Sequence, residues 1–297
     1  MPAARIAVVG SLHYDVMVDA PDRPRKGETL IGRSWWPKCG GKGGNQAVEA
    51  RLAGASVAMI GAVGDDDFGR ALIENLDRVG VDRSAVATLP GVGSGMSVAI
   101  FDDTGDYGAV VVSGANRAIP LDGLTAERFA GTHVLLLQNE VPEPVNIAAA
   151  RAAKEAGARV ILNAAPARAP DATLVPLVDI LVVNAIEAEM LGGGAVSTLQ
   201  DAAAAAARLA ERFASVIVTA GGEGLAVCSP DAASPVSLAA DRVTVASTHG
   251  AGDCFVGVLA AHLGAGVGLQ DAAIAANRAA GRLVAMAEED RAGRLAG

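Results

Sequence analysis

Aromatic residues, cysteine and clustered positive charge are all scarce in this chain. Phe, Trp and Tyr make up 3% of the 297 residues and hydrophobic residues 51%, so the core has to be built from small aliphatic side chains. The formal net charge is −9 and no long basic run occurs, which excludes nucleic acid and anionic membrane surfaces as expected partners. No apolar stretch reaches membrane-spanning length without a glycine, a proline or a charged residue.

Cysteine and histidine residues are too few and too far apart in the sequence to indicate a metal site or a disulfide framework. The three cysteines and four histidines show neither metal-ligand spacing nor a disulfide pattern. The N-terminus lacks the apolar core of a signal peptide. We therefore expect a soluble, cytoplasmic protein, and the chain length allows one large α/β domain or two small ones.

Apolar runs that alternate with alanine-rich segments indicate an α/β fold with a mostly parallel central sheet and helices on both faces. Strands are predicted at residues 6–9, 56–63, 133–137, 159–162, 180–183 and 216–219. Two excursions of short β-like pieces, with a hairpin signal in the second, interrupt this rhythm. The predicted boundaries are 1–14, 40–93 and 114–297 for the main α/β domain, and 15–39 and 94–113 for a small β lid.

A glycine-rich junction at residues 247–257 is the most informative stretch. It follows a β-like run at 241–246 and leads into an apolar segment, 254–263, that is predicted to be a buried helix. The glycines let the backbone turn tightly and leave N–H groups uncovered at a helix start, which favours an anion. Asp253 in this turn could accept a proton from an alcohol that attacks a phosphoryl group held there. The alternative is an Asp that only caps the helix.

A second glycine-rich stretch, residues 39–48, contains Lys42 and Asn45 and opens an alanine-rich helix that is predicted to run from Asn45 to Ala53. It does not match a P-loop, and the loop after the first strand does not match the dinucleotide fingerprint. Asp15 follows that strand, where open α/β sheets bind ligands, although it could simply form a turn.

Polar side chains also follow four later strands. They are Gln138–Glu140, Asn163, Asn184 with Glu187, and Thr219–Gly224. One such residue alone would be interpreted as a helix cap. Because the carboxyl ends of parallel strands meet at one edge of a sheet, the four groups predict a single crevice along that edge.

Together these residues resemble the ribokinase-like (PfkB) family of carbohydrate kinases. The resemblance rests on Gly40-Gly-Lys-Gly-Gly-Asn45 and, far downstream, Thr248-His-Gly-Ala-Gly-Asp253, and it extends from about Arg5 to Met286. Asn184–Glu187 and Thr219–Gly221 match two further family positions. The resemblance implies transfer of the γ-phosphoryl group of ATP to the primary hydroxyl of a pentose, with ribose as the first choice and ribose 5-phosphate as the product.

The same resemblance implies a role for each residue of the site. Asp253 is the base, and the backbone of Gly250, Ala251 and Gly252 is the anion hole. Sugar hydroxyls are expected at His13, Asp15, Gly41, Lys42, Asn45 and Glu140. ATP is expected at Asn184, Thr219, Gly221, Gly224, Gly252 and Asn277, with Mg²⁺ near Glu187 through water. The two β excursions are expected to cover the sugar and to pair two subunits into a homodimer.

Several positions depart from the family pattern. His13 stands where the ribose kinases of the family have Asn, so a related pentose or a nucleoside stays open as the acceptor. The Asp of the family's monovalent-cation site is Ser247 here, and a late Gly-Ala-x-x-Ser loop is replaced by Ala287–Arg291. We therefore predict weak or absent activation by potassium. Cys254 lies at a helix start, where packing and redox sensitivity are alternatives.

Two other functions compete with the sugar kinase. A nucleoside kinase of the same fold would use the same base in a roomier pocket. A non-catalytic sugar or nucleotide sensor would be expected to lose the base, whereas Asp253, its neighbouring glycines and Glu187 are all present.

Overall fold

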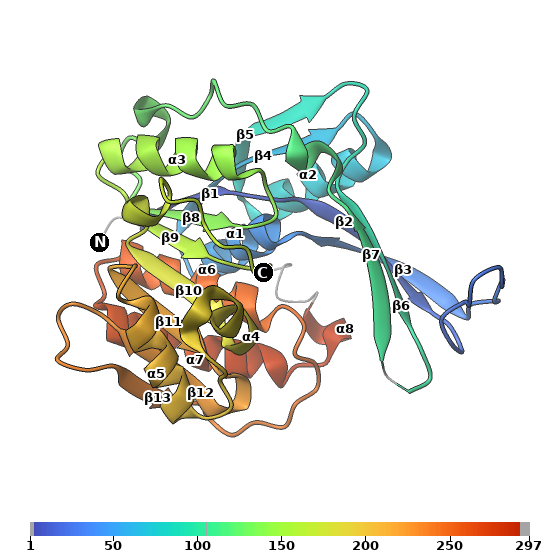
Figure 1. Cartoon of the computed structure of the whole chain (residues 1–297). Helices are drawn as coiled ribbons and strands as arrows, with labels where there is room; N and C mark the ends of the chain where they lie inside the picture. The colour runs from blue at the N-terminus through green and yellow to red at the C-terminus, as the bar shows by residue number, and fades with distance from the viewer. Residues whose placement is uncertain (1–2, 105, 292–297) are drawn as a thin grey trace.

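The computed structural model describes residues 3–104 and 106–291, and these residues form two β-sheets with helices around the larger one (Figure 1). The larger sheet has nine strands in the order β13-β12-β11-β10-β9-β8-β1-β4-β5. All pairings from β11 to β5 are parallel, whereas β12 and β13 add antiparallel strands. The predicted fold class is therefore confirmed.

The strands of this sheet are β1 Arg5–Val9, β4 Ser56–Gly64, β5 Asp82–Leu89, β8 Val134–Gln138, β9 Arg159–Asn163, β10 Ile180–Asn184, β11 Ser215–Thr219, β12 Gly224–Cys228 and β13 Val236–Ala239. The helices are α1 Lys42–Leu52, α2 Asp67–Val79, α3 Glu143–Glu155, α4 Ala185–Ala188, α5 Leu199–Leu209, α6 Ala251–Gly264, α7 Leu269–Val284 and α8 Glu288–Arg291. Single helical turns lie at Gly114–Arg117, Ala126–Phe129, Val175–Leu177, Glu189–Gly193 and Gly221–Glu223.

Helices cover both faces of the large sheet and enclose two hydrophobic cores. In β8 every residue is buried, with Leu135 and Leu137 in one core and Val134 and Leu136 in the other. Helices α3 and α5 close the first core, and α1, α2, α6 and α7 close the second. Parallel strands buried on both faces are apolar throughout, which is why these runs were recognisable in the sequence.

The smaller sheet has four strands in the order β3-β2-β6-β7 and projects from the main body (Figure 1). Its strands are β2 His13–Asp19, β3 Ser34–Gly40, β6 Met96–Phe101 and β7 Tyr107–Val112. The predicted hairpin is β6–β7, which pairs antiparallel. Strand β2 begins at His13, so the sheet reaches closer to β1 than the predicted lid does.

Some local predictions were wrong. Residues 241–246 do not form a strand, and they are exposed, because they cross from the sheet edge at β13 to the start of α6 with no strand beside them. Residues 29–31, which lie in the first of the two predicted β excursions, are irregular. Helix α1 begins at Lys42 rather than at Asn45, and the edge strand β5 was not anticipated. Within residues 3–104 and 106–291, no helix has the length and apolar character needed to cross a membrane.

Candidate active site

The predicted site residues come from the carboxyl ends of neighbouring parallel strands and from the small sheet. Glu140 follows β8, Asn163 ends β9, Asn184 ends β10 and Thr219 ends β11. These four strands are adjacent in the order β11-β10-β9-β8, so their ends line one edge of the sheet.

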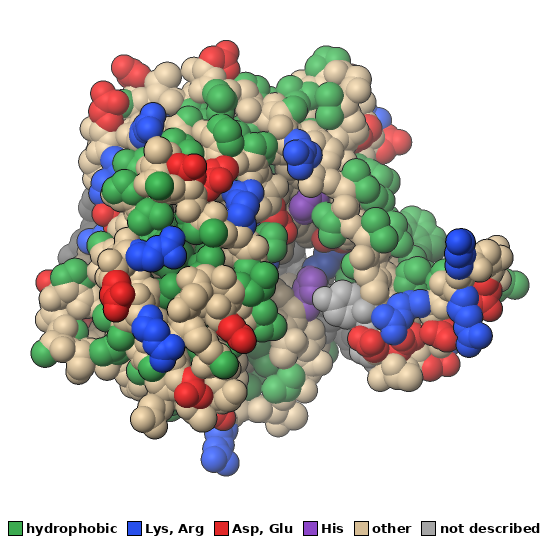
Figure 2. All heavy atoms as spheres, in the orientation of Figure 1, with side chains coloured by type: hydrophobic (Ala, Val, Ile, Leu, Met, Phe, Trp, Pro, Cys, Tyr) green, Lys and Arg blue, Asp and Glu red, His purple; other side chains and the backbone are tan. Residues whose placement is uncertain are grey.

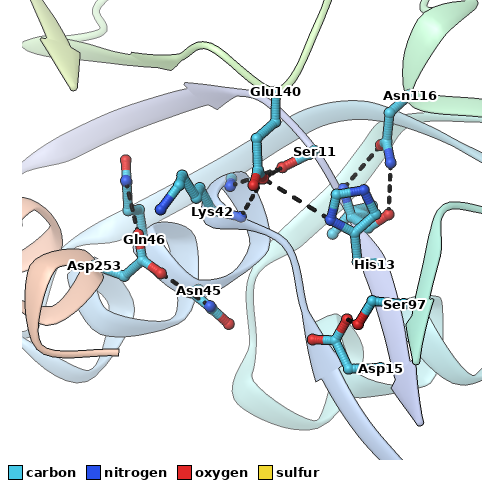
Figure 3. A network of polar contacts seen from close by, with 12 residues as sticks. Ser11, His13, Asp15, Lys42, Asn45, Gln46, Ser97, Asn116, Glu140 and Asp253 are labelled. Carbon is cyan, nitrogen blue, oxygen red and sulfur yellow. Dashed lines mark hydrogen bonds and ion pairs between the residues drawn. The ribbon is translucent and has the colours of Figure 1, made fainter. Parts of the chain in front are cut away.

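Asp253 lies in the first turn of α6 with its side chain turned away from a capping position. Gly250 is the N-cap residue of α6, with φ 77°, a left-handed conformation that favours glycine, and it makes no side-chain cap bond. The Asp253 carboxylate instead accepts hydrogen bonds from Asn45 Nδ2 at 2.9 Å and Gln46 Nε2 at 3.0 Å (Figure 3). The helix-cap alternative is therefore wrong.

Burial is the main influence on the charge of Asp253, a residue that is only 9% exposed. Desolvation raises the pKa of this carboxyl, because the charged form loses hydration. The positive charge of Lys42 and the two amide donors lower the pKa, and nearby Glu140 raises it. The net result is a carboxylate more basic than an ordinary aspartate.

The buried amide of Gln46 was not anticipated as a site residue. Its Nε2 donates both to Asp253 and to Asn163 Oδ1, the latter at 3.1 Å, and its Oε1 accepts from Gln138 Nε2 at 2.8 Å. Gln46 has no exposed surface. In the sequence, the only indication of this role was an amide directly after Asn45 on a helix otherwise rich in alanine. In the structure, the Gln46 amide orients the Asp253 carboxylate.

A second cluster surrounds Glu140. Its Oε2 accepts hydrogen bonds from Ser11 Oγ and from the backbone N–H of Lys42, the latter at 2.9 Å, and lies 3.8 Å from His13 Nδ1 (Figure 3). The His13 ring is 5% exposed, and its Nε2 has no hydrogen-bond partner among the described residues. His13 is therefore buried beside Glu140.

The start of α1 needs glycine because it packs directly against the loop after β1. Gly41 has φ 83°, and a Cβ at this position would lie 2.8 Å from the Ser11 carbonyl oxygen and the His13 nitrogen. A Cβ would clash with both backbone atoms at that distance. This close approach places the Lys42 backbone N–H on Glu140 and the Asn45 side chain on Asp253.

Asp15 reaches the site from the small sheet. It lies in β2, so the turn alternative is wrong, and it accepts a hydrogen bond from Ser97 Oγ of β6 (Figure 3). Burial raises the pKa of the Asp15 carboxyl, while Ser97 and the charges of His13, His249 and Lys38 oppose that shift. The small sheet thus contributes a half-buried hydrogen-bond acceptor of its own.

The residues expected to bind the nucleotide make fewer contacts with one another than the residues around Asp253 and Glu140 do. Asn184 and Glu187 form a capping box: Asn184 Oδ1 accepts from the Glu187 N–H at 2.8 Å, and Glu187 Oε2 accepts from the Asn184 N–H at 2.9 Å. Thr219 Oγ1 donates to the Val183 carbonyl at 3.4 Å, and Asn277 Nδ2 donates to the Ala239 carbonyl at 3.3 Å. Gly221 and Gly224 both have positive φ.

The donor set around Glu187 fits a magnesium ion that arrives with phosphates. Burial raises the pKa of Glu187, whereas the charge of Lys42 lowers it and that of Asp253 raises it. In the described part of the chain no group of three or more His, Cys, Asp or Glu side chains could hold a metal by itself. Mg²⁺ commonly binds one or two carboxylates and completes its octahedron with phosphate oxygens and water.

A cavity of roughly 1010 Å³ opens beside Asp253, between the small sheet and helices α1 and α2. Figure 2 shows the molecule hollowed between the small sheet and the main body. The lining includes Trp36 and Lys38 of β3, Asn45 of α1 and His249 and Asp253 near α6.

Cys254, the residue after Asp253, is fully buried in the second core, which favours the packing alternative over redox sensitivity.

Comparison with known proteins gives consistent matches along nearly the whole chain. The model of the pfkB family of carbohydrate kinases matches residues 3–287. Ribokinase of Mus musculus is 34% identical over 265 residues, which are 88% of this chain and 82% of the mouse protein. Deoxyribokinase of Salmonella typhi is 34% identical over 259 residues, 86% of this chain and 84% of its own. The structure of Arabidopsis thaliana ribokinase complexed with ribose and ATP covers 99% of both chains, with a TM-score of 0.88 and 28% identity.

Proposed function

This chain belongs to the pfkB family of carbohydrate kinases, which transfer a phosphoryl group to an alcohol, and we propose that it phosphorylates the primary hydroxyl of a pentose with ATP. Ribose is the first choice of acceptor, giving ribose 5-phosphate. The observation that carries the proposal is the buried Asp253, held by Asn45 and Gln46 at the start of α6. This geometry gives a basic carboxylate beside the backbone N–H groups at the start of α6, as phosphoryl transfer to an alcohol requires.

In this proposal the sugar lies between the main body and the small sheet. Its hydroxyls bind Asp15, Asn45, Glu140 and the Gly41–Lys42 segment, and His13 acts on the sugar through Glu140. The small sheet, with residues 15–39 and 94–113, closes over the sugar as a lid on the main domain of 1–14, 40–93 and 114–297. Closure excludes water, which would otherwise compete with the sugar for the phosphoryl group.

The nucleotide lies on the other side of the base. Its phosphates approach the backbone N–H groups of Gly250, Ala251 and Gly252, where the helix dipole of α6 adds positive potential. The rest of ATP lies along Asn184, Thr219, Gly221, Gly224 and Asn277. Mg²⁺, held near Glu187 through water, neutralises phosphate charge when bound. Asp253 takes the proton of the attacking hydroxyl, and its raised pKa makes it a stronger base for that step.

A nucleoside is the second candidate acceptor, because His13 stands where the ribose kinases of the family have Asn. A non-catalytic sensor is less well supported, because the base and its amide donors are fully assembled. Cytoplasmic localisation fits the composition and stays part of the proposal.

We also propose a homodimer formed through the small sheet. Strand alternation places Val16 and Val18 of β2 on one face with Trp35 of β3 and Val110 of β7, the last two being 66% and 69% exposed. Exposed apolar faces of this kind mark protein interfaces. Val110→Asp should give monomers by light scattering, whereas Val111→Asp, 58% exposed on the opposite face, should leave the dimer intact. A monomeric unmodified protein would contradict this part of the proposal.

The reaction itself is tested by ADP release from Mg·ATP across ribose, deoxyribose, other pentoses, hexoses and nucleosides, with the position of the phosphate determined by NMR. We expect turnover on ribose and phosphate on its primary hydroxyl. Turnover on a nucleoside alone would keep the mechanism and change the acceptor. Mg·ATP binding without turnover on any member of the panel would contradict the kinase and favour the sensor.

A further inference from the structure

An arginine near the end of the described chain binds the loop that leads into α6. Arg291, the last residue of α8, donates from Nη2 to the Ser247 carbonyl at 2.6 Å and from Nη1 to the His249 carbonyl at 2.7 Å. Nη2 also donates to the Leu283 carbonyl in the last turn of α7, at 2.8 Å. One guanidinium group thus joins two separate segments through three backbone carbonyl oxygens.

The position of these carbonyls links Arg291 to the anion hole. The loop is also tied to α7 by Ala246 and Ser247, whose N–H groups both donate to the Val284 carbonyl. The His249–Gly250 peptide is planar and trans, so a carbonyl that points at Arg291 turns the Gly250 N–H to the opposite side. Arg291 therefore fixes the peptide orientation immediately before Gly250, Ala251 and Gly252.

The electrostatics of this arrangement require a cation. Three carbonyl oxygens that converge on one point repel one another unless positive charge lies between them, and the C-terminal end of α7 adds negative potential. The guanidinium is permanently charged and presents several donors in a fixed plane, so it can satisfy all three oxygens at once. Arg291 also lines the cavity that contains Asp253.

The family resemblance places a monovalent cation at this loop, but the residues present do not fit one. Ser247 offers a hydroxyl where the family has a carboxylate, and the Ser247 and His249 carbonyls are already bound by Arg291. We propose that Arg291 is a built-in cation that orders the anion-hole loop, so that the enzyme does not depend on potassium. This inference rests on the proposed kinase function, and it identifies Arg291 as a positioning residue.

The experiment compares the unmodified protein with Arg291→Met and Arg291→Lys, each in potassium chloride and in choline chloride of equal ionic strength. Arg282→Met is the matched control, since it removes an exposed arginine from the last turn of α7. Two quantities are measured: kcat with the best acceptor, and the rise in melting temperature on adding Mg·ATP. The second readout needs no sugar, so it tests Arg291 even if no acceptor is phosphorylated.

For the unmodified protein and Arg282→Met we expect both quantities to be the same in either salt. Arg291→Met should lose kcat by roughly ten- to a hundredfold, because it leaves three carbonyls without a charged donor, and should show a smaller Mg·ATP shift. Low millimolar guanidinium should restore part of both, and potassium should now have an effect. Arg291→Lys should lie between, since an ammonium group lacks the planar fork.

Two results would overturn the inference. One is a many-fold activation of the unmodified protein by potassium, which can be measured even if Arg291→Met fails to fold. The other is an Arg291→Met protein whose kcat and Mg·ATP shift equal those of Arg282→Met. A Mg·ATP shift that depends on Arg291 in a protein without sugar turnover would keep this inference while contradicting the proposed acceptor.

Discussion

The two sides of the crevice are built in different ways. On the base side, Asp253, Gln46 and Glu140 are connected to neighbouring side chains and backbone groups by hydrogen bonds before any ligand binds. On the nucleotide side, Asn184, Thr219 and Asn277 bond mainly to backbone groups of their own surroundings. The proposed base is therefore held by several partners, whereas the residues proposed to bind the nucleotide make few hydrogen bonds each.

This difference predicts different kinetic consequences. A preorganised group acts in the transition state, so its loss should lower kcat. A single contact to bound ATP is made equally in the ground state and the transition state, so its loss should raise KM and leave kcat nearly unchanged. Substitutions on the two sides can separate these outcomes.

The largest effect is expected for Asp253→Asn. The side chain keeps its size but can no longer accept the proton of the attacking hydroxyl, so kcat should fall by roughly 10²- to 10⁴-fold. Steady-state kinetics measure the loss, and calorimetry with Mg·ATP checks that nucleotide binding persists. A kcat within a few-fold of the unmodified protein would rule out Asp253 as the base.

Gln46→Leu should have the next largest effect. It removes a donor to Asp253 and leaves Gln138 Nε2 and Asn163 Oδ1 without their partner, so kcat should fall roughly tenfold or more. KM for ATP should change little. Gln200→Leu, the same substitution on the exposed surface of α5, serves as the control and should match the unmodified protein. Equal kcat for the two variants would contradict a positioning role for Gln46.

Asn277→Ala should have the smallest effect, and this effect should be seen in KM for ATP rather than in kcat. One neutral hydrogen bond accounts for roughly a two- to tenfold change, so KM for ATP should rise within that range while kcat stays within about twofold. The control is Gln270→Ala, an exposed residue of the same helix. A fall in kcat with unchanged KM would remove the distinction between the two sides.

Most of the sheet and both glycine motifs were predictable from the sequence, for physical reasons. Strands such as β8 are buried on both faces and therefore apolar throughout, and the turns at Gly41 and Gly250 require a conformation that favours glycine. The strand predicted at 241–246 was wrong, because an alternating pattern forms a strand only where a partner strand lies beside it. Edge strand β5 carries a weaker apolar pattern and was missed.

The contacts that define the base side were less accessible to sequence reasoning. Gln46 is a polar residue on a helix, and nothing local distinguishes a buried amide from an exposed one. Its partners Gln138, Asn163 and Asp253 are distant in sequence, and only the packing of α1 against α6 and the sheet brings them together. Arg291 likewise reaches the loop at Ser247 through tertiary packing.

In the proposed reaction Asp253 acts as a carboxylate whose basicity is set by burial and by its amide donors. The most direct measurement is the pH dependence of kcat/KM in the unmodified protein and in Gln46→Leu. A base must be deprotonated, so activity should fall as the pH drops through a pKa that lies above that of an ordinary aspartate. Because Gln46 lowers the pKa of Asp253, its loss should move this acidic limb to higher pH. An acidic limb at the ordinary aspartate pKa, unmoved in Gln46→Leu, would contradict this role of Asp253.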